Sequence, residues 1–165
     1  MIVDTSLLLA AFVPDQRMHA ECAQVLRTVR PLVLSPLVLA ELDYLTARIA
    51  GVDAELTLLA ELSSGAYELA SFGLDDMARA RTVVERYRDL PLGLTDASLV
   101  VLAGRQEPAR TPTRQLGLTD ASLVVLADRY GTDTIGTLDE RHFRVVRSVS
   151  GRHLRILPAD ADPDG

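Results

Sequence analysis

The stretch "MIVDTSLLLAAFV", residues 1–13, begins as an apolar run, reaches an acid and continues with a different pattern. Ile2 and Val3 are β-branched, which is typical of a short buried strand. The run "LLLAAFV" predicts one or two helical turns that end before Pro14, because proline cannot continue a helix. A strand that passes into a helix through Asp4 is the unit from which α/β sheets are built.

The same alternation continues along the 165-residue chain. The clearest helix is "SPLVLAELDYLTARIAG", residues 35–51, since Ser35 suits the N-cap, Pro36 the first helical position and Gly51 the end. Further helices are expected at 16–29, 52–63 and 74–89, and strands at 31–35, 66–72, 132–139 and 153–158. We therefore expect a three-layer α/β/α fold with a mostly parallel central sheet over residues 1–158. Residues 159–165 are expected to form a disordered tail.

Composition excludes several classes of protein. Apolar residues make up 48% of the chain, which suits one ordinary hydrophobic core, and no apolar run is long enough to span a membrane. The start lacks the features of a signal peptide, and the single cysteine, Cys22, excludes a disulfide framework, so we expect a cytoplasmic protein without membrane contact. The net charge of −6 argues against a protein that coats DNA. All seventeen basic residues are arginine, which excludes mechanisms that need a lysine.

Acidic residues stand at the points where apolar elements end or begin. Asp4 follows the first strand, and Asp139 ends the apolar stretch "TDTIGTLD". The carboxyl ends of parallel strands meet at one edge of a sheet, which is where ligands bind in such folds. Glu41 lies at the border of the helix stripe that we expect to be buried, and glutamate seldom lies so deep without a partner. That stripe consists of Val38, Leu42, Leu45 and Ile49.

A further acid lies in the block "LGLTDASLVVLA", which occurs twice, at 92–103 and at 116–127. Each copy opens an apolar helix with Thr-Asp, so the acid is Asp96 or Asp120. Spacing does not choose between Asp96 and Asp120. A tandem insertion, whether of 92–115 or of 104–127, leaves the upstream spacing unchanged for Asp96 and the downstream spacing unchanged for Asp120. The second copy continues through "DRYG" into a short link to the next strand, whereas the first meets Gly104 and Pro108. We therefore favour Asp120, with Asp96 as the alternative.

Four carboxylates in one pocket require a cation. Two unit charges 4 Å apart repel by about 4 kcal/mol at an effective dielectric constant of 20. Ligands that are all oxygen suit Mg²⁺ or Mn²⁺, and such a cation supplies the Lewis acidity for phosphodiester hydrolysis. We predict a metal held by Asp4, Asp120 and Asp139, a catalytic set of these three with Glu41, and supporting hydroxyls from Ser6 and Thr137.

Four segments resemble the ordered acid motifs of PIN domains, and above all those of VapC toxins from VapBC toxin–antitoxin modules. They are "MIVDTS", "SPLVLAELDYL", "GLTDASLVVLADRYG" and "TIGTLDERHF". The resemblance covers nearly the whole chain. It implies a PIN fold, a Mg²⁺- or Mn²⁺-dependent endoribonuclease that cuts tRNA or ribosomal RNA in structured loops, a homodimer, and inhibition by a VapB antitoxin. The second copy of the third motif departs from the family pattern, so the alternative is a catalytically impaired PIN-fold protein that only binds antitoxin.

Other enzyme classes fit the residues less well. A haloacid-dehalogenase phosphatase needs a second aspartate at position 6, where this chain has Ser6. A dinucleotide-binding motif and a nucleophile elbow are both missing from the sequence. The three histidines, His19, His142 and His153, are scattered, and we expect none of them to be catalytic. The arginines of the C-terminal part are expected to contact RNA phosphates.

Overall fold

The computed structural model describes residues 1–87 and 117–161. Within these residues, five parallel strands form one sheet in the order β3-β2-β1-β4-β5. The strands are β1 (Ile2–Val3), β2 (Leu32–Leu34), β3 (Tyr67–Leu69), β4 (Thr134–Gly136) and β5 (Arg155–Leu157). The expected parallel sheet is confirmed, and the described strands contain no antiparallel pair; an isolated antiparallel bridge joins Arg147 to His153 outside them.

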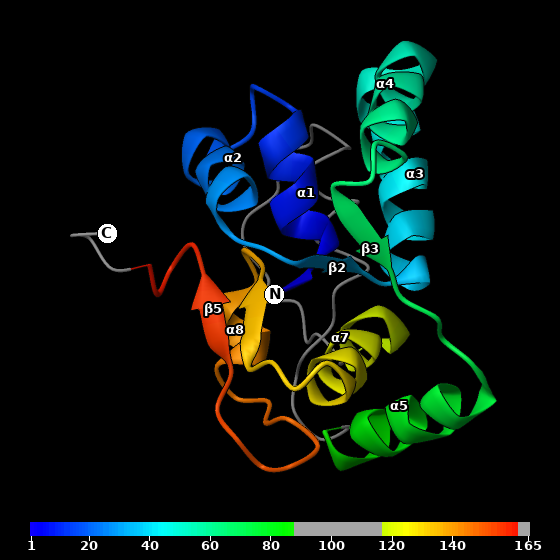
Figure 1. Cartoon of the computed structure of the whole chain (residues 1–165), viewed down its shortest axis with the longest axis vertical. Coiled ribbons are helices and arrows are strands. Elements are labelled where there is room, and N and C mark those ends of the chain that lie inside the picture. Colours follow the sequence, from blue (N-terminus) through cyan, green and yellow to red (C-terminus); the bar gives the residue numbers. More distant parts are fainter. Residues whose placement is uncertain (88–116, 162–165) are drawn as a thin grey trace, which may run out of the picture.

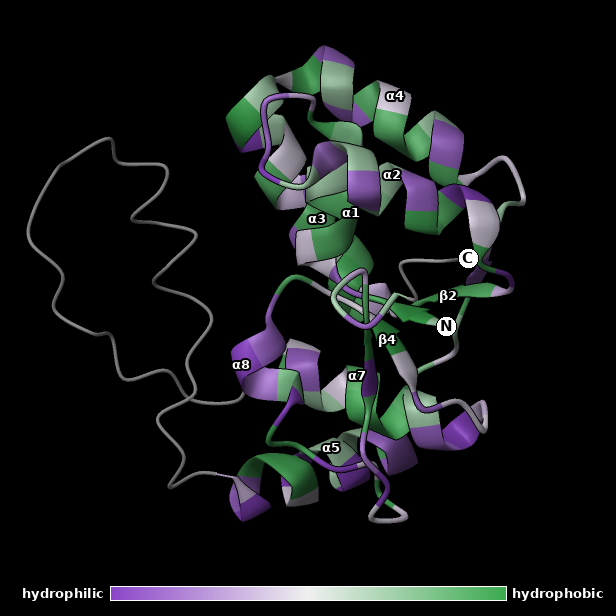
Figure 2. Cartoon of the chain, turned by 90° about the vertical axis from the view of Figure 1, so that its left-hand side faces the viewer, coloured by the Kyte–Doolittle hydropathy of each residue, from purple (hydrophilic) through white to green (hydrophobic). Residues whose placement is uncertain are grey.

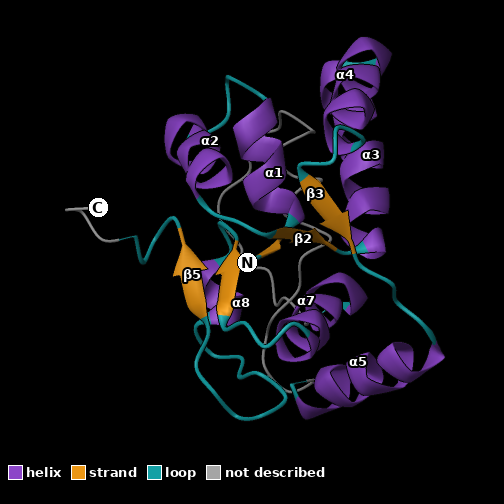
Figure 3. Cartoon of the chain, in the orientation of Figure 1, coloured by secondary structure: helices purple, strands orange, loops and turns teal. Residues whose placement is uncertain are grey.

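Helices cover both faces of this sheet, as Figures 1 and 3 show. On one side lie α1 (Thr5–Phe12), α2 (His19–Thr28), α3 (Pro36–Ala50) and α4 (Val52–Leu62), and on the other lie α5 (Leu74–Arg86) and α7 (Leu118–Arg129). The short α8 (Glu140–Phe143) follows β4. The three-layer α/β/α fold expected from the sequence is therefore confirmed. No helix in these described ranges has the length and apolar character needed to cross a membrane.

The helix α7 carries the centre of the core. Every residue from Asp120 to Ala127 is buried, so this helix is apolar almost all the way round, as expected for a helix enclosed by the rest of a domain (Figure 2). It packs against α5, α3 and the two central strands β1 and β4. The second copy of the repeated block thus lies at the centre of the domain. The first copy lies outside the described residues.

The helix boundaries follow local chemistry. Ser35 caps α3 by accepting a hydrogen bond from the Leu37 N–H at 3.2 Å, and Gly51 ends it with φ 84°. The helix expected to begin at residue 16 begins at His19, because Met18 has a left-handed φ of 65°. In α3, Thr46 is buried, whereas Ile49, which we expected in the core, is only half-buried.

The end of the domain is more ordered than its composition indicates. We expected disorder from residue 159, but the Asp160 carboxylate accepts hydrogen bonds from the Ile156 N–H at 2.8 Å and from the Arg144 guanidinium at 2.6 and 2.9 Å. These bonds fold residues around Asp160 back onto β5 and the segment after α8. Arg144 therefore holds Asp160 in the described part of the chain, whereas residues 162–165 of the expected tail lie outside the described residues.

Candidate active site

Asp4 lies at the carboxyl end of β1 and caps α1. Its Oδ1 accepts a hydrogen bond from the Thr5 N–H at 2.7 Å, and its Oδ2 accepts one from each of the Ser6 and Thr137 hydroxyls, both at 2.7 Å. The residue is 2% exposed. Three donors on two oxygens fix the orientation of this carboxyl group, so both hydroxyls that we predicted as supporting groups do contact Asp4.

The Ser6 and Thr137 hydroxyls also join the ends of β1 and β4. Ser6 Oγ accepts a hydrogen bond from the Leu138 N–H at 3.0 Å, and Thr137 Oγ1 accepts one from the Asp139 N–H at 3.0 Å. The two hydroxyl oxygens lie 3.1 Å apart. This network fixes the backbone that leads into Asp139 relative to Asp4, because each hydroxyl bonds to both segments.

Glu41 reaches the same region from the first half of α3. Its Oε2 accepts a hydrogen bond from the Thr5 hydroxyl at 2.7 Å. Burial raises the pKa of Glu41, the Thr5 bond opposes this, and the Asp4 carboxyl raises the pKa further. Thr5 is a site residue that the sequence reasoning missed; its position directly after Asp4 was the available signal.

Asp120 lies in the first turn of α7 and is 1% exposed. Its Oδ2 accepts a hydrogen bond from the Gly117 N–H at 3.1 Å, which caps the helix, whereas its Oδ1 has no hydrogen-bond partner among residues 1–87 and 117–161. Burial raises the pKa of Asp120 to about 8, with further increases from the carboxyls of Asp4, Asp139 and Glu41. A buried carboxyl group with an unpartnered oxygen and three acidic neighbours is costly unless a cation compensates it.

The chain contains an internal comparison for Asp120. Asp76 occupies the same local position in α5, where its Oδ2 accepts a hydrogen bond from the Gly73 N–H at 2.9 Å, and it is 2% exposed. The Arg129 guanidinium, however, bonds to both Asp76 oxygens at 2.5 and 2.6 Å. The pKa of Asp76 is lowered, first by the Gly73 bond and also by Arg129. The same helix-start position therefore holds a carboxyl group that pairs with an arginine in α5 and one without such a partner among the described residues in α7.

Asp139 lies at the N-terminus of α8, directly after the hydroxyl network. Its Oδ1 accepts a bond from the His142 N–H at 3.4 Å, and its Oδ2 lies 2.9 Å from Nδ1 of the His142 ring. That ring is buried, and its nitrogen is not aligned as in a good hydrogen bond within the described residues. We expected no catalytic histidine, and the structure places His142 against Asp139. The spacing of three residues at a helix start was the signal for this contact.

Four predicted acids therefore converge where the carboxyl ends of β1 and β4 meet α3 and α7: Asp4, Glu41, Asp120 and Asp139. Their mutual influence is electrostatic. Burial raises the pKa of Asp4, against the bonds from Ser6, Thr137 and Thr5, and the Asp139 carboxyl raises it again. No three of these or other acidic, histidine or cysteine side chains in the described ranges are close enough to form a ready-made metal cluster. Mg²⁺ in proteins usually keeps several waters, so a site for it does not require every carboxylate to touch the ion.

The donor set fits a hard divalent cation. All three candidate ligands are carboxylates, and Oδ1 of Asp120 is a buried acceptor without a donor in the described residues. Asp4, Asp120 and Asp139 would hold the ion, as oxygen ligands suit Mg²⁺ or Mn²⁺. Asp96 lies outside the described residues, so the preference for Asp120 over Asp96 stays a prediction.

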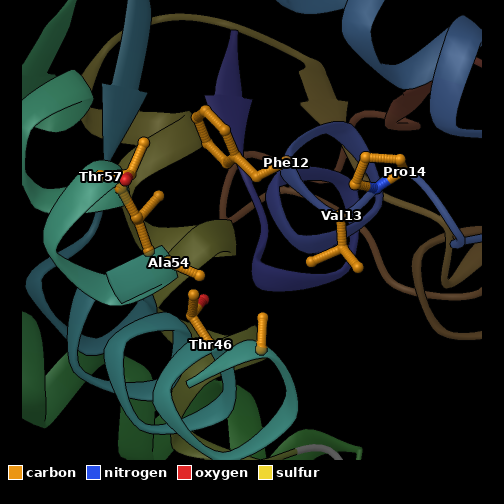
Figure 4. A pocket seen from close by; sticks show the side chains of 8 residues that line it. Phe12, Val13, Pro14, Thr46, Ala54 and Thr57 are labelled. Atoms are coloured by element: carbon orange, nitrogen blue, oxygen red, sulfur yellow. The ribbon is translucent and has the colours of Figure 1, made fainter. Parts of the chain in front are cut away.

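An apolar hollow beside α1 is separate from the acids. It has a volume of about 290 Å³ and lies at the far end of α1 from Asp4. Figure 4 shows Phe12 and Val13 on one side of it and Thr46 and Ala54 on the other. Its lining is apolar, so it offers no acidic group for the chemistry expected at the acid site.

Not all of the C-terminal arginines are available to RNA. Arg144 pairs with Asp160 and also with Glu140. Arg155 donates to the Asp160 carbonyl. Arg144 and Arg155 already have partners within the protein. Contact with RNA phosphates therefore stays a prediction for the other arginines of the C-terminal part.

Comparison with known proteins agrees with this geometry. The PIN domain family model matches residues 1–148. The chain is 41% identical over 161 residues to Ribonuclease VapC26 of Mycobacterium tuberculosis strain ATCC 25618 / H37Rv, which covers 96% of this chain and all of that protein. A crystal structure of Mycobacterium tuberculosis VapC20, described as a sarcin-ricin loop cleaving toxin, matches the fold with a TM-score of 0.61 at 18% identity, over 84% of this chain and 89% of that one. The arrangement of four acids at the carboxyl edge of the sheet, the family match and the near full-length similarity lead to one conclusion: this chain belongs to the PIN-domain family and, within it, to the VapC ribonuclease toxins.

Proposed function

We propose that this protein is a Mg²⁺- or Mn²⁺-dependent endoribonuclease that cuts structured RNA, either tRNA or ribosomal RNA. The observation that carries the proposal is Asp120: a buried carboxyl group with a pKa near 8 and one oxygen without a partner in the described residues, surrounded by three further acids. A protein does not assemble such groups for stability, because each uncompensated charge opposes folding. Perturbed carboxyl groups gathered in one place are instead typical of a functional site.

The residues divide into ligands and positioning groups. Asp4, Asp120 and Asp139 are proposed to bind the cation, and Glu41 to act beside them. When bound, the cation supplies Lewis acidity at the scissile phosphate and activates water. Ser6 and Thr137 hold Asp4 through two hydrogen bonds, and Thr5 holds Glu41 through one, so these hydroxyls keep the carboxylates in register.

The relatives support the proposed biology. VapC26 is a ribonuclease by name, and VapC20 is described as a toxin that cleaves the sarcin-ricin loop. By analogy, we propose that this chain acts in the cytoplasm as a homodimeric toxin and that a VapB-like antitoxin neutralises it.

The test is RNA cleavage with matched single-atom changes. Purified wild type and the variants Asp4→Asn, Asp96→Asn and Asp120→Asn are incubated with folded tRNA and ribosomal RNA in Mn²⁺ or in EDTA. We expect cleavage by wild type and Asp96→Asn in Mn²⁺, loss of at least 100-fold in the other two variants, as is usual when an electrostatic catalytic group is removed, and no cleavage in EDTA. Equal cleavage by wild type and Asp4→Asn would refute the proposed chemistry. Loss only in Asp96→Asn would transfer the third acid to the other copy.

A second function, antitoxin binding without catalysis, is favoured by one specific observation. The third acid motif occurs twice in the sequence, one copy more than the family pattern has. This alternative predicts that wild type binds antitoxin but leaves RNA intact with Mn²⁺, and that deletion of residues 92–115 restores cleavage. Full activity of the intact chain would eliminate it.

A further inference from the structure

A second hollow lies outside the acid site, between the C-terminal half of α5 and the segment after α8. It has a volume of about 120 Å³, too small for the usual drug-sized ligand but open to one flat ring. Val83, Tyr87 and Val149 supply apolar surface, and three arginines line the same hollow. We call it the arginine pocket, and its cationic residues are Arg79, Arg86 and Arg147.

Helix geometry explains how α5 supplies one wall. Arg79, Val83 and Arg86 are spaced by four and three residues, so they follow one another along one side of the helix. Val83 is buried against the core, whereas Arg79 and Arg86 are exposed on either side of it. The helix therefore presents an apolar strip between two guanidinium groups.

The opposite wall is fixed to the first. The Arg147 N–H donates a hydrogen bond to the Tyr87 hydroxyl at 3.0 Å, which joins the two walls directly. The Arg147 guanidinium contacts Nδ1 of His153, and Ser148 is bonded to the backbone of Arg152 at both its N–H and its hydroxyl. The pocket is thus formed by backbone-anchored groups and not by two surfaces that merely lie near each other.

The charge of the pocket is not neutralised locally. Within the described part of the chain, Arg79 and Arg86 form no ion pair, and Arg147 contacts only a histidine ring. Glu85, the neighbour of Arg86 in α5, pairs with Arg81 at 2.8 Å. Asp76 is bound by Arg129, and Arg79 adds to the positive charge near it. On a protein with a net charge of −6, three such arginines around one apolar hollow create a local positive potential that attracts a polyanion.

The pocket also lies beside the acid site. Asp76, in the first turn of α5, pairs with Arg129, in the last turn of α7, and the two helices pack along each other (Figure 2). They therefore run in opposite directions. Ten residues from Asp76 to Arg86 and nine from Arg129 back to Asp120 span similar lengths at 1.5 Å a residue. The arginine pocket is thus level with the end of α7 that carries Asp120.

We propose that the arginine pocket binds one unstacked base of the RNA, beside the phosphate that is cut, while its arginines contact the adjacent phosphates. An apolar floor with an aromatic ring and a cationic rim is the chemistry that single-stranded RNA requires. An acidic peptide would satisfy the charges but has less need of a hollow for a flat ring. This inference rests on the proposed function, because the RNA is the proposed substrate of the acid site.

Binding without catalysis tests the pocket. A fluorescently labelled RNA hairpin with an unpaired loop is titrated with full-length protein in EDTA, at several salt concentrations, and followed by anisotropy. We expect Arg86→Gln and Arg147→Gln each to bind about tenfold more weakly and to lower the salt slope by roughly 0.7, the value for one lost phosphate contact on a single strand. The control is Arg81→Gln, which removes an equal charge from the other side of α5, where Arg81 pairs with Glu85 at 2.8 Å. It should bind as wild type does.

Three further outcomes decide the matter. Hairpins that lack one loop base at a time are titrated with wild type, and we expect weaker binding when one particular base is missing. In Val149→Trp, whose new side chain fills the hollow, loss of that base should not change the affinity. The proposal is refuted if Arg86→Gln and Arg147→Gln bind RNA as tightly as Arg81→Gln does, or if wild type binds all abasic hairpins equally. It is also refuted if the two variants lose antitoxin binding while their RNA binding is unchanged. Thermal unfolding checks that each variant is folded.

Two outcomes separate the pocket from the proposed function. RNA binding in EDTA that depends on the arginines, with no cleavage in Mn²⁺, would refute the proposed function alone. RNA cleavage with an unchanged KM in Arg86→Gln and Arg147→Gln would refute the pocket alone.

Discussion

In the metal-free protein, the free energy of unfolding should fall between pH 5 and pH 7. Replacing Asp120 by Asn should remove most of this fall. The pKa of Asp120 is about 8 in the folded protein, against an ordinary value of 3.8, because the group is buried among other acids. The folded state therefore keeps a proton that the unfolded state releases. Its contribution to stability is fully present below pH 4 and is lost as the pH rises towards 8.

The magnitude follows from proton linkage. One proton retained only by the folded state changes the free energy of unfolding by about 1.36 kcal/mol per pH unit. Between pH 5 and pH 7 the Asp120 contribution should therefore fall by about 3 kcal/mol, a large part of the 5–15 kcal/mol that is typical of a domain. Asp4 and Glu41, whose pKa values are also raised, act in the same direction in wild type and variant. The difference between the two proteins therefore isolates Asp120.

The assay is urea unfolding followed by circular dichroism at pH 5, 6 and 7 in EDTA. The matched control is Asp76→Asn, which removes a carboxyl group from the same helix position, where the pKa is lowered. That control should retain the pH dependence of wild type over this range, since Asp76 is ionised in both states. Adding Mg²⁺ at pH 7 should stabilise wild type more than Asp120→Asn, because a ligand stabilises the state that binds it. A wild type whose stability changes from pH 5 to pH 7 no more than that of Asp120→Asn would refute the reasoning.

Three stability predictions, each measured by urea unfolding, test the frame around the site. Arg129→Met should cost roughly 2–3 kcal/mol, less than a fully buried pair because Arg129 is 35% exposed, and adding Asp76→Asn should recover part of it; an additive double variant would contradict the pairing. Ser35→Ala should cost about 1 kcal/mol, through the loss of the α3 cap, and a neutral effect would argue against that cap. Gly136→Ala should cost about 1–3 kcal/mol, because the new Cβ would meet Leu7 Cδ1 and Met1 Sδ at 3.1 Å; an unchanged stability would show that these side chains move aside freely.

Local patterns in the sequence were sufficient for most of the elements and for the positions of the candidate acids within them. Apolar runs followed by acids placed Asp4 and Asp139 at the ends of strands, and cap chemistry placed the start and end of α3. These features depend on residues close together in the chain, so periodicity and cap preferences report them directly. Boundaries were less accurate where a single backbone angle decided them, as at Met18.

Contacts between distant segments could not be read in the same way. The Thr5 bond to Glu41, the position of His142 against Asp139 and the ordering of Asp160 by Arg144 each depend on how packed elements face one another. The composition around Asp160 did not indicate its contact with Arg144, because that arginine lies 16 residues earlier in the chain.

The two segments "GLDD", residues 73–76, and "GLTD", residues 117–120, mark the limit of the sequence by itself. Local chemistry determines the same outcome in both: an aspartate in the first helical turn accepts a hydrogen bond from the glycine N–H before it. The tertiary structure decides what each carboxyl group becomes. Packing of α5 on α7 gives Asp76 the guanidinium of Arg129, whereas Asp120 is buried among Asp4, Glu41 and Asp139. Charge compensation depends on what lies across the fold, and this difference separates a structural ion pair from a candidate metal site.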